Sequence, residues 1–567
     1  MTRRIWSVDG KVPDEISGNK ELQENVTRFV RLYRRLNIKA LLNITCPVHE
    51  LKMPSAPEEV YRFLNYVILK SNVACLFGGQ VKLLLRIVKM VLMRTVSTKV
   101  LLGDVMRGFV VGRIKWLNCY SSSNLKWSLL SKLVSWFVTE FIGPLINGHF
   151  HGTDSTHMKH KIFYYRKAVW QSLITRAMRR EVKSGKLHKM KSSDRGRVID
   201  HPKAPPSVKL RFIPKKNLSE VRLIGKPVSK LHKHTASSFK ALLRKFSNSI
   251  DGARADLNGN TLCQEWTRLV ETVDPRRELF WITADISDAF GSVRLSKLCT
   301  IIQEIRRKLF SDDRDESEDI VRMLYLHTGT HQVGGKSPTY LITRGLIQGD
   351  PLSPVLSDIY YGHMVSVKMT QFTKAPPAPP VETVETGLDW TVPLATVEIF
   401  LRGADDFIFV STDRERIESF RDLLLKGFPE YNCTFKDSKT TTNIFDSSSK
   451  ERLIKFCGAQ INVKTREIFP DFSSYKDTNV FSLQSWDQKA RRPGAFIKMR
   501  FHLFCGIRQT KLYYGPYNSK RRLLITVAAN VSLALRRLTC MLDTLVWSRG
   551  RKVKGSWLWK VILKGFR

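Results

Sequence analysis

Apolar residues recur at intervals of three and four along much of the first third of the chain. The four segments with this spacing are 59–70, 81–95, 125–146 and 166–183. Arginine and lysine occupy the other faces of these segments, which is typical of amphipathic helices packed against a core. We therefore predict that residues 1 to about 200 are mostly helical.

The pattern changes near residue 209, where short runs of β-branched residues begin to alternate with helical spacing. This alternation indicates an α/β architecture. Two proline-bearing stretches, 192–208 and 373–390, fit neither a helix nor a central strand, and we interpret them as a linker and an exposed insertion. Residues 476–567 return to helical spacing and hold 20 Lys and Arg against 3 Asp and Glu, which predicts a basic helical C-terminal part.

Two apolar, strand-like runs carry aspartates: LFWITADISDAFGSV contains Asp285 and Asp288, and LRGADDFIFV contains Asp405 and Asp406. If the strands are neighbours and Asp285 lies beside Asp405, three carboxylates meet and repel one another unless a cation offsets them. Mg²⁺ takes oxygen ligands and keeps substrate phosphates in its shell, so a divalent metal is the expected partner. A lone Asp-Asp pair is usually a turn or a solvated face, but the apolar context and the second strand favour a catalytic site.

The chain carries 94 basic and 51 acidic residues, a net charge of +43. Such an excess repels itself unless an anion offsets it, and nucleic acid is the expected anion. A membrane surface is the alternative, but the basic residues are spread along the whole chain and the N-terminus has no apolar signal region. Nine scattered cysteines without a C-x-x-C pair argue against disulfides and zinc and indicate a reducing compartment.

Several segments, in a fixed order over roughly 270 residues, resemble the motifs of reverse transcriptases. ADISDAF and GADDFIFV are similar to motifs A and C, and GLIQGDPLSPVLSDIYYGHM lies between them and is similar to motif B. Upstream, KLRFIPKKNLSEVRLIGKP resembles motifs 1 and 2 of the fingers. Downstream, FKDSKTTTN resembles motif D, and FCGAQINV resembles motif E. This ordered series of motifs is far more specific for a reverse transcriptase than any single motif.

Three further features resemble the telomerase family. KIFYYRKAVWQSLITRAMRREVKSGKL (about 161–187) is similar to the T motif, which binds telomerase RNA in that family. FCG followed by PDFSSY resembles the telomerase form of motif E, and YYGHM resembles the helix after motif B. The chain is similar to a short form of the family without a separate N-terminal domain. Ala404 departs from the larger aliphatic residue of telomerases and is similar to retroelement enzymes.

The resemblance implies a two-metal site that uses Mg²⁺, with Mn²⁺ as an alternative. The implied metal ligands are Asp285, Ile286, Asp405 and Asp406. The implied nucleotide-binding residues are Lys215, Arg222, Asp288, Ala289, Phe290, Gln348, Gly349 and Ala404. Phe290 would be the gate against a ribose 2′-hydroxyl, although its spacing alone fits a core position. Lys439 would act as a catalytic general acid toward pyrophosphate, although a solvated loop lysine fits the same pattern.

The resemblance also implies a primer grip and an RNA-binding surface. The primer grip would be Phe456, Cys457 and Gly458. In the T motif, aromatic residues alternate with cations, which suits single-stranded RNA because bases stack on rings while cations meet phosphates. The candidate RNA contacts are Phe163, Tyr164, Tyr165, Arg166, Lys167 and Trp170. Trp170 fits the core equally well, since it lies next to an apolar stripe that includes Val169 and Leu173.

We therefore expect a multidomain fold with an all-α RNA-binding domain (1–205), α/β fingers and palm of a right-hand polymerase (206–475), and a mostly helical thumb (476–567). The implied reaction extends a single-stranded telomeric DNA primer with dNTPs, copying a bound telomerase RNA template subunit. The expected location is the nucleus, at chromosome ends. A retroelement or intron reverse transcriptase is one alternative, and a non-catalytic RNA-binding scaffold is another. The intact aspartate trio speaks against the scaffold.

Overall fold

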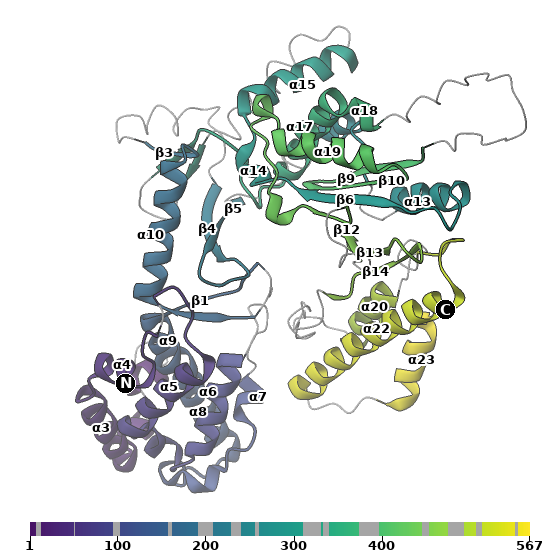
Figure 1. Cartoon of the computed structure of the whole chain (residues 1–567). Helices are drawn as coiled ribbons and strands as arrows, with labels where there is room; N and C mark the ends of the chain where they lie inside the picture. Colours follow the sequence, from purple (N-terminus) through teal and green to yellow (C-terminus); the bar gives the residue numbers. More distant parts are fainter. Residues whose placement is uncertain are drawn as a thin grey trace, which may run out of the picture.

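The computed structural model groups the chain into N-terminal helices, a central α/β part and C-terminal helices (Figure 1). The described residues are 1–6, 13–49, 51–93, 102–156, 161–190, 208–227, 240–255, 260–309, 330–332, 339–373, 396–444, 453–473, 493–505, 513–549 and 554–566. The predicted linker and the predicted insertion lie almost entirely outside these residues.

Helices dominate the N-terminal part, as the periodicity predicts. They are α1 (Thr2–Trp6), α2 (Asp14–Ser17), α3 (Lys20–Arg34), α4 (Ile38–Thr45), α5 (Pro57–Ser71), α6 (Val81–Met93), α7 (Leu102–Met106), α8 (Ser123–Trp136) and α9 (Gly143–His149). Three 3₁₀ segments lie between them, η1 (Val73–Phe77), η2 (Val111–Arg113) and η3 (Lys115–Leu117). Asn19, Asn37 and Ser122 cap α3, α4 and α8 with their side chains, which fixes where these helices begin.

The segment Ser123–His149 is long and apolar enough to cross a membrane, judged by length and composition only. Its continuity is broken by a π-helical stretch, η4 (Phe137–Ile142). Leu130, Leu133 and Phe137 are fully buried in the apolar core of the N-terminal part. The segment therefore packs as a core helix of a globular domain, as we predict for its apolar stretch.

A short hairpin interrupts the helices and corrects the expectation of an all-α N-terminal domain. β1 (Phe150–Thr153) pairs antiparallel with β2 (Phe163–Arg166), and α10 (Lys167–Lys183) follows directly. The aromatic run in β2 favours an extended strand. The helical periodicity of α10 begins at the very next residue and conceals this short strand in the sequence.

A five-stranded sheet connects the N-terminal part to the α/β part, in the order β3-β8-β7-β4-β5. Its strands are β3 (Leu187–Lys189), β4 (Val208–Pro214), β5 (Val221–Pro227), β7 (Thr330–Gln332) and β8 (Thr339–Ile342). β3 comes directly after α10 and pairs with β8, with Leu187 opposite Ile342. The end of the predicted RNA-binding segment is therefore built into the same sheet as the predicted fingers.

A second sheet, ordered β11-β6-β10-β9, forms the centre of the α/β part. Its strands are β6 (Phe280–Asp285), β9 (Glu398–Gly403), β10 (Asp406–Ser411) and β11 (Thr441–Thr442). Phe407 and Phe409 of β10 enter one apolar core, while Ile408 and Val410 enter another on the opposite face. Both faces are therefore covered, which explains the continuous apolar run that follows Asp406.

Helices supply the two cores that cover this sheet. They are α13 (Asn260–Thr272), α14 (Ala289–Ser292), α15 (Leu295–Leu309), α17 (Ser353–Lys368), α18 (Thr370–Thr373) and α19 (Arg414–Lys426). Two 3₁₀ turns follow, η5 (Pro429–Tyr431) and η6 (Asp437–Lys439). α17, predicted from the motif B segment, is buried along most of its length and contacts α15 and α14.

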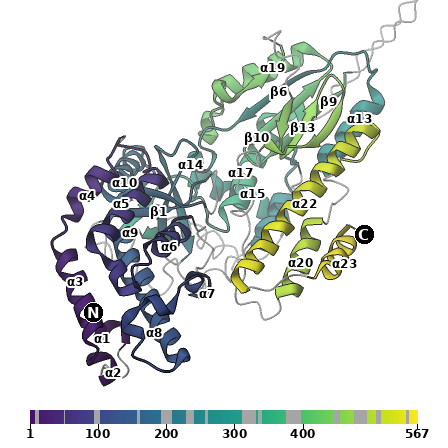
Figure 2. The same cartoon turned by 90° about the horizontal axis from the view of Figure 1, so that it is seen from below.

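A third sheet joins the α/β part to the C-terminal helices. Its strands are β12 (Ile454–Phe456), β13 (Ala459–Asn462) and β14 (Glu467–Pro470), and the helices are α20 (Pro493–Cys505), α22 (Lys520–Arg549) and α23 (Gly555–Phe566). The side chain of Asn518 bonds both the amide and the carbonyl of Ile468, at 2.9 and 2.6 Å, and so fastens α22 to β14. α22 also contacts α7, so the N- and C-terminal parts meet (Figure 2).

A buried ion pair links β9 to α17. The Arg402 side chain is 1% exposed, and its Nη2 lies 2.7 Å from Oδ1 of Asp358. Its Nη1 donates to the carbonyl of Ala404 at 3.0 Å, and Arg254 approaches the other carboxylate oxygen of Asp358 at 3.0 Å. Arg402 thus ties the motif B helix to the turn that carries the paired aspartates.

Asp358→Ala should destabilise the chain by about 3–5 kcal/mol, because it leaves the Arg402 guanidinium buried without a counter-charge. Equilibrium denaturation monitored by circular dichroism measures this change. Asp422→Ala is the control, since Asp422 is exposed on α19 and its loss should cost less than about 0.5 kcal/mol. Equal stability of the two variants would show that the ion pair contributes nothing to folding.

Candidate active site

The paired aspartates lie at a tight turn between two strands. β9 ends at Gly403 and β10 begins at Asp406, so Ala404 and Asp405 form the loop of a two-residue hairpin. Ala404 has a φ of 59°, the left-handed conformation that such turns require. The sequence prediction of a strand through both aspartates is therefore corrected for Asp405, which lies in the turn and is half-buried, whereas Asp406 is the exposed first residue of β10.

The neighbouring strand brings the third carboxylate to this turn. β6 pairs antiparallel with β10 in a register that sets Asp285 opposite Asp406, and Asp285 lies beside Asp405 as expected. The Ile286 amide donates to the Asp405 carbonyl at 3.1 Å and fixes the turn against the end of β6. Carboxylate oxygens of Asp285, Asp405 and Asp406 all lie within 4.8 Å of one another.

This proximity changes the electrostatics of the carboxyl groups. Burial raises the pKa of Asp405 above its ordinary value, and the charge of Asp285 raises it further. The Asp406 side chain reaches the surface, but neighbouring protein atoms partly exclude water from its carboxylate; this desolvation raises its pKa to about 6, with added contributions from Asp405 and Asp285. Lys439 forms an ion pair with Asp285 and offsets part of this charge. Three carboxylates this close together, two of which have a raised pKa, fit a divalent cation, which would offset their negative charge.

A cavity of about 730 Å³ opens beside the three aspartates. The predicted site residues that line it are Lys215, Arg222, Asp285, Ile286, Asp288, Ala289, Phe290, Gln348, Asp405 and Lys439. Asp406, Gly349 and Ala404 do not line it. The fingers hairpin β4–β5, the motif A helix α14 and the motif B loop therefore converge on one space, as the resemblance implies.

Phe290 lies on α14, five residues after Asp285, and is half-buried at the cavity wall. Its carbonyl accepts from the Leu346 amide at 2.7 Å, which ties α14 to the motif B loop. The ring also packs partly against the core of the α/β part. Its position is compatible with a gate, because the side chain borders the cavity instead of being enclosed by the core.

The motif B loop packs closely on the fingers strand β5. The Gln348 carbonyl accepts from the Gly225 amide at 2.7 Å. Gly349 has a φ of 90°, and a Cβ there would lie 2.5 Å from a methyl group of Ile224 and 2.8 Å from the Gly225 carbonyl. Only glycine suits both the backbone conformation and this close approach.

The predicted primer grip is the turn between β12 and β13. Cys457 and Gly458 are exposed and have positive φ values of 47° and 83°, while Phe456 is 2% exposed and belongs to the core. Gly403, the last residue of β9, faces this turn. A Cβ at Gly403 would collide with the sulfur of Cys457. The exposed turn therefore lies next to the aspartate hairpin, and the buried Phe456 side chain anchors the turn to the core.

Burial corrects part of the predicted RNA-binding set. Tyr164, Tyr165 and Trp170 are 5%, 0% and 7% exposed, so their rings belong to the core and are not free to stack on bases. The hydroxyl of Tyr165 donates to the Leu218 carbonyl at 2.8 Å. The sequence prediction failed here because both faces of β2 are covered: Tyr164 packs in the core of the N-terminal helices, and Tyr165 packs in a second core with α10.

The rest of this set lies closer to the surface. Lys167 is exposed, and Phe163 and Arg166 are half-buried. Arg166 donates to the Cys46 carbonyl at 2.6 Å and to Asn43 at 2.8 Å, so it helps to join β2 to α4. Lys167 and Phe163 are therefore the predicted RNA contacts that remain most accessible.

The cavity also contains cations that the sequence reasoning missed: Arg180, Lys186, Arg344 and Lys436. The Nε of Arg344 is buried and has no hydrogen-bond partner among the described residues. Arg344 precedes the motif B glycine and Lys436 lies three residues before Lys439, so proximity to motifs could have indicated both. Lys186 lies near the end of the segment that resembles the T motif, but about 100 residues before motif A, so the sequence does not indicate that it reaches this cavity.

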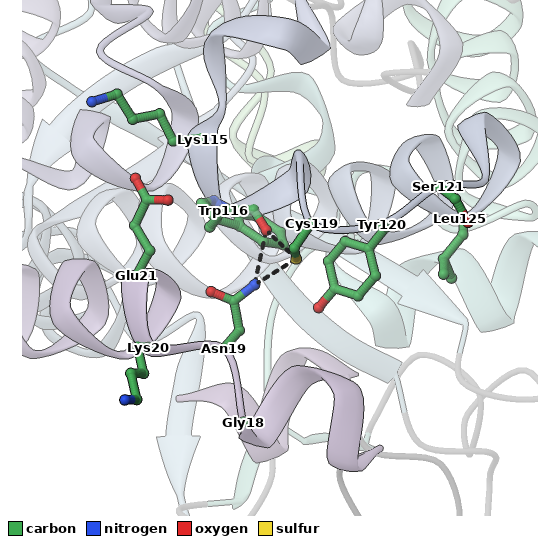
Figure 3. Close-up of a pocket in the computed structure, with 10 residues that line it drawn as sticks. All are labelled: Gly18, Asn19, Lys20, Glu21, Lys115, Trp116, Cys119, Tyr120, Ser121 and Leu125. Carbon is green, nitrogen blue, oxygen red and sulfur yellow. Dashed lines mark hydrogen bonds between the residues drawn. The ribbon is translucent and has the colours of Figure 1, made fainter.

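A second cavity, of about 640 Å³, lies in the N-terminal part beside the start of α3 (Figure 3). The Asn19 side chain donates to the Trp116 carbonyl at 2.8 Å and to the sulfur of Cys119 at 3.2 Å. The Trp116 indole donates to the Leu76 carbonyl at 2.8 Å, and the residue is 2% exposed. These contacts join α3 to η3, and we assign no chemistry to this cavity.

Two family models match the chain. Residues 59–181 match "Telomerase ribonucleoprotein complex - RNA binding domain", and residues 213–461 match "Reverse transcriptase (RNA-dependent DNA polymerase)". A curated telomerase reverse transcriptase of Arabidopsis thaliana is 24% identical over 64% of this chain and 38% of its own length. The mouse protein of the same name is 22% identical over 85% of this chain and 50% of its own length. The chain thus spans about half the length, or less, of these relatives.

Solved structures show a similar fold over the whole chain. Telomerase from Candida albicans, solved with a TWJ fragment of telomeric RNA, gives a TM-score of 0.72 at 16% identity, covering 99% of this chain and 88% of that one. Telomerase from Candida tropicalis, solved with the corresponding fragment, gives 0.67 at 15% identity, covering 100% and 89%. The expected multidomain arrangement of helical and polymerase-like parts is confirmed.

Proposed function

Because the chain belongs to the telomerase reverse transcriptase family, we propose that it is an RNA-directed DNA polymerase that extends a DNA 3′ end by copying a bound RNA. The observation that carries this proposal is the meeting of Asp285, Asp405 and Asp406 within 4.8 Å at the edge of a basic cavity. A non-catalytic scaffold has no use for three carboxylates this close together, where burial and the charge of Asp285 raise the pKa of both Asp405 and Asp406.

The three aspartates would hold two divalent cations, Mg²⁺ in the first instance, together with the carbonyl of Ile286. Such ions would lower the pKa of the primer 3′-hydroxyl and offset charge on the departing pyrophosphate. The chain's own residues align the reactants: the turn that the Ile286 amide fixes holds the carboxylates, and α14 forms the wall on which the sugar rests. Holding a hydroxyl and a phosphorus atom in reactive geometry supplies much of the rate enhancement.

The cations around the cavity would bind the triphosphate. Lys215 and Arg222 reach the triphosphate from the fingers hairpin. The Lys215 ammonium also lies 2.6 Å from a carboxylate oxygen of Glu220.

Lys439 is paired with Asp285, and from this position its ammonium could donate a proton to pyrophosphate. The Lys439→Met substitution should therefore lower the rate of nucleotide incorporation more than it weakens nucleotide binding.

We propose that the N-terminal part binds a dedicated telomerase RNA, that the DNA substrate is a single-stranded chromosome end, and that the protein works in the nucleus. The match of residues 59–181 to the telomerase RNA-binding family supports the first point. The Candida structures that contain a telomeric RNA fragment support it as well. The net charge of +43 supports nucleic acid as the main partner.

Sequencing the RNA that co-purifies with the full chain from its native cells tests this proposal. We expect one abundant RNA with a short stretch complementary to the chromosome-end repeat of the same cells. The reason is that unpaired bases read by the protein allow selection of one RNA, whereas contacts to phosphate alone do not.

The matched control is Asp405→Ala, which should retain the same RNA because the substitution lies in the α/β part. Recovery of the protein's own messenger or of an intron would instead indicate a retroelement or intron enzyme. Recovery of unrelated RNAs without preference would leave a polymerase without a dedicated template.

A further inference from the structure

Lys186 lies between α10 and β3, and its side chain lines the cavity beside the aspartate triad. Its ammonium forms an ion pair with Asp288 and lies 3.8 Å from the carboxylate of Glu181. Its side chain is only 18% exposed. Lys186 also lies between the two segments that match family models, 59–181 and 213–461, so neither match assigns it a role.

The backbone around Lys186 is held from two sides. Its amide donates to the Glu181 carbonyl at 3.0 Å at the end of α10. Its carbonyl accepts from the Thr343 amide at 3.1 Å, and the Thr343 hydroxyl donates to the Gly185 carbonyl at 2.6 Å. The ammonium is therefore presented to the cavity from a fixed backbone, which distinguishes Lys186 from a freely moving surface lysine.

The ion pair lies directly on the motif A helix. Gly291 of α14 has no Cβ, and a Cβ there would collide with Nζ of Lys186 and with a carboxylate oxygen of Asp288. The backbone of Gly345 packs on the other side, where an added Cβ would lie 2.8 Å from the Gly291 Cα. Gly291 thus makes room for a lysine from the N-terminal part to reach Asp288, two residues from Phe290, and Gly345 allows the motif B loop to pack on α14.

We propose that Lys186 is a positioning residue of the nucleotide site, which neutralises Asp288 at the cavity wall so that an anionic triphosphate can enter. This inference rests on the proposed function. Without Lys186, the half-exposed Asp288 carboxylate would add an unpaired negative charge to a cavity that already holds the triad. Repulsion between that carboxylate and the triphosphate would weaken nucleotide binding.

Steady-state incorporation of one dNTP by the full chain on a supplied RNA–DNA duplex tests the inference. Lys186→Met should raise the KM for dNTP about fivefold, the size expected of one partly exposed charge pair. It should leave kcat within about twofold of the parent, because the triad is untouched. Lys186→Arg should restore the parent KM. Lys183→Met is the matched control, since Lys183 is exposed on the last turn of α10, does not line the cavity, and should leave KM unchanged.

The double variant Lys186→Met, Asp288→Asn separates a charge effect from a structural one. Removing the carboxylate that Lys186 offsets should return KM toward the parent value, whereas damage to the fold would persist. A parent-like KM in Lys186→Met, or a double variant no better than the single one, would overturn the inference.

A measurement of nucleotide binding tests the role of Lys186 independently of the proposed polymerase activity. If the parent chain extends no primer, the proposed function fails, and anisotropy of a fluorescent deoxynucleoside triphosphate with Mg²⁺ still compares affinities. The inference then requires about fivefold weaker binding by Lys186→Met than by the parent. Equal affinities would overturn it.

Discussion

Replacing Asp405 with alanine is expected to lower the rate of primer extension at least about a thousandfold while RNA binding is retained. Asp285→Ala and Asp406→Ala should have effects of the same order, because the three carboxylates lie within 4.8 Å and would share the same metal ions. The loss would be chemical, since the proposed RNA-binding part, residues 59–181, lies on other helices and strands than the aspartates. The measurement is single-nucleotide extension of an RNA–DNA duplex over a Mg²⁺ titration, with RNA affinity measured on the same preparations.

Two controls show whether the fold survives. Asp422→Ala removes an exposed carboxylate on α19 and should extend primers at the parent rate. Asp406→Asn should leave the thermal stability of the metal-free chain equal or higher, because burial and its two neighbours raise the pKa of Asp406 to about 6 and make its ionised form costly at neutral pH. An Asp405 variant that extends primers at near the parent rate would show that the metal assignment is wrong.

The N-terminal helices were predictable because their periodicity is long and regular. The predicted segment 59–70 became α5 (Pro57–Ser71), and 81–95 became α6 (Val81–Met93). The hairpin β1–β2 was not predictable in the same way, since each strand has only four residues and α10 begins where β2 ends. Short strands give too few alternations to outweigh an adjoining helical pattern.

The sequence predicts that the three aspartates lie together, because two apolar strand-like runs carry them. It does not predict where each aspartate lies in the strands and the turn. The two-residue turn takes Ala404 and Asp405 out of the strands, so β10 begins at Asp406 and this residue is the one paired with Asp285. Burial on both faces also removes the alternation that would have marked where β10 begins.

Contacts between distant segments were the least predictable part of the site. Lys186 meets Asp288 across 102 residues of sequence, and Arg402 meets Asp358 across 44. A single lysine in a chain with 94 basic residues carries no signal of its own. The first pair forms because backbone hydrogen bonds join Lys186 to Thr343 and the motif B loop to α14, and the second because β9 packs on α17.

Phe290→Ala is expected to lower the ratio of incorporation efficiencies, dNTP over rNTP, by between about 10- and 200-fold, the range set by one missing apolar contact in a pocket. The ring borders the cavity beside Asp288 and Ala289, and hydrogen bonds to the motif B loop hold its backbone in place. Because neighbouring elements fix α14, removal of the ring should leave open space where a ribose 2′-hydroxyl can fit. The measurement is kcat/KM for matched dNTP and rNTP substrates with parent and variant.

Two variants decide whether the effect belongs to the ring at this position. Phe290→Tyr keeps the ring and should keep the parent ratio. Phe435 is half-buried and does not line the cavity, and its ring centroid lies 5.4 Å from that of Phe407. Phe435→Ala should therefore lower the stability of the chain and leave the dNTP-over-rNTP ratio unchanged. If Phe290→Ala also leaves the ratio unchanged, its partial packing against the core is its whole role, and discrimination against ribonucleotides must come from another wall of the cavity.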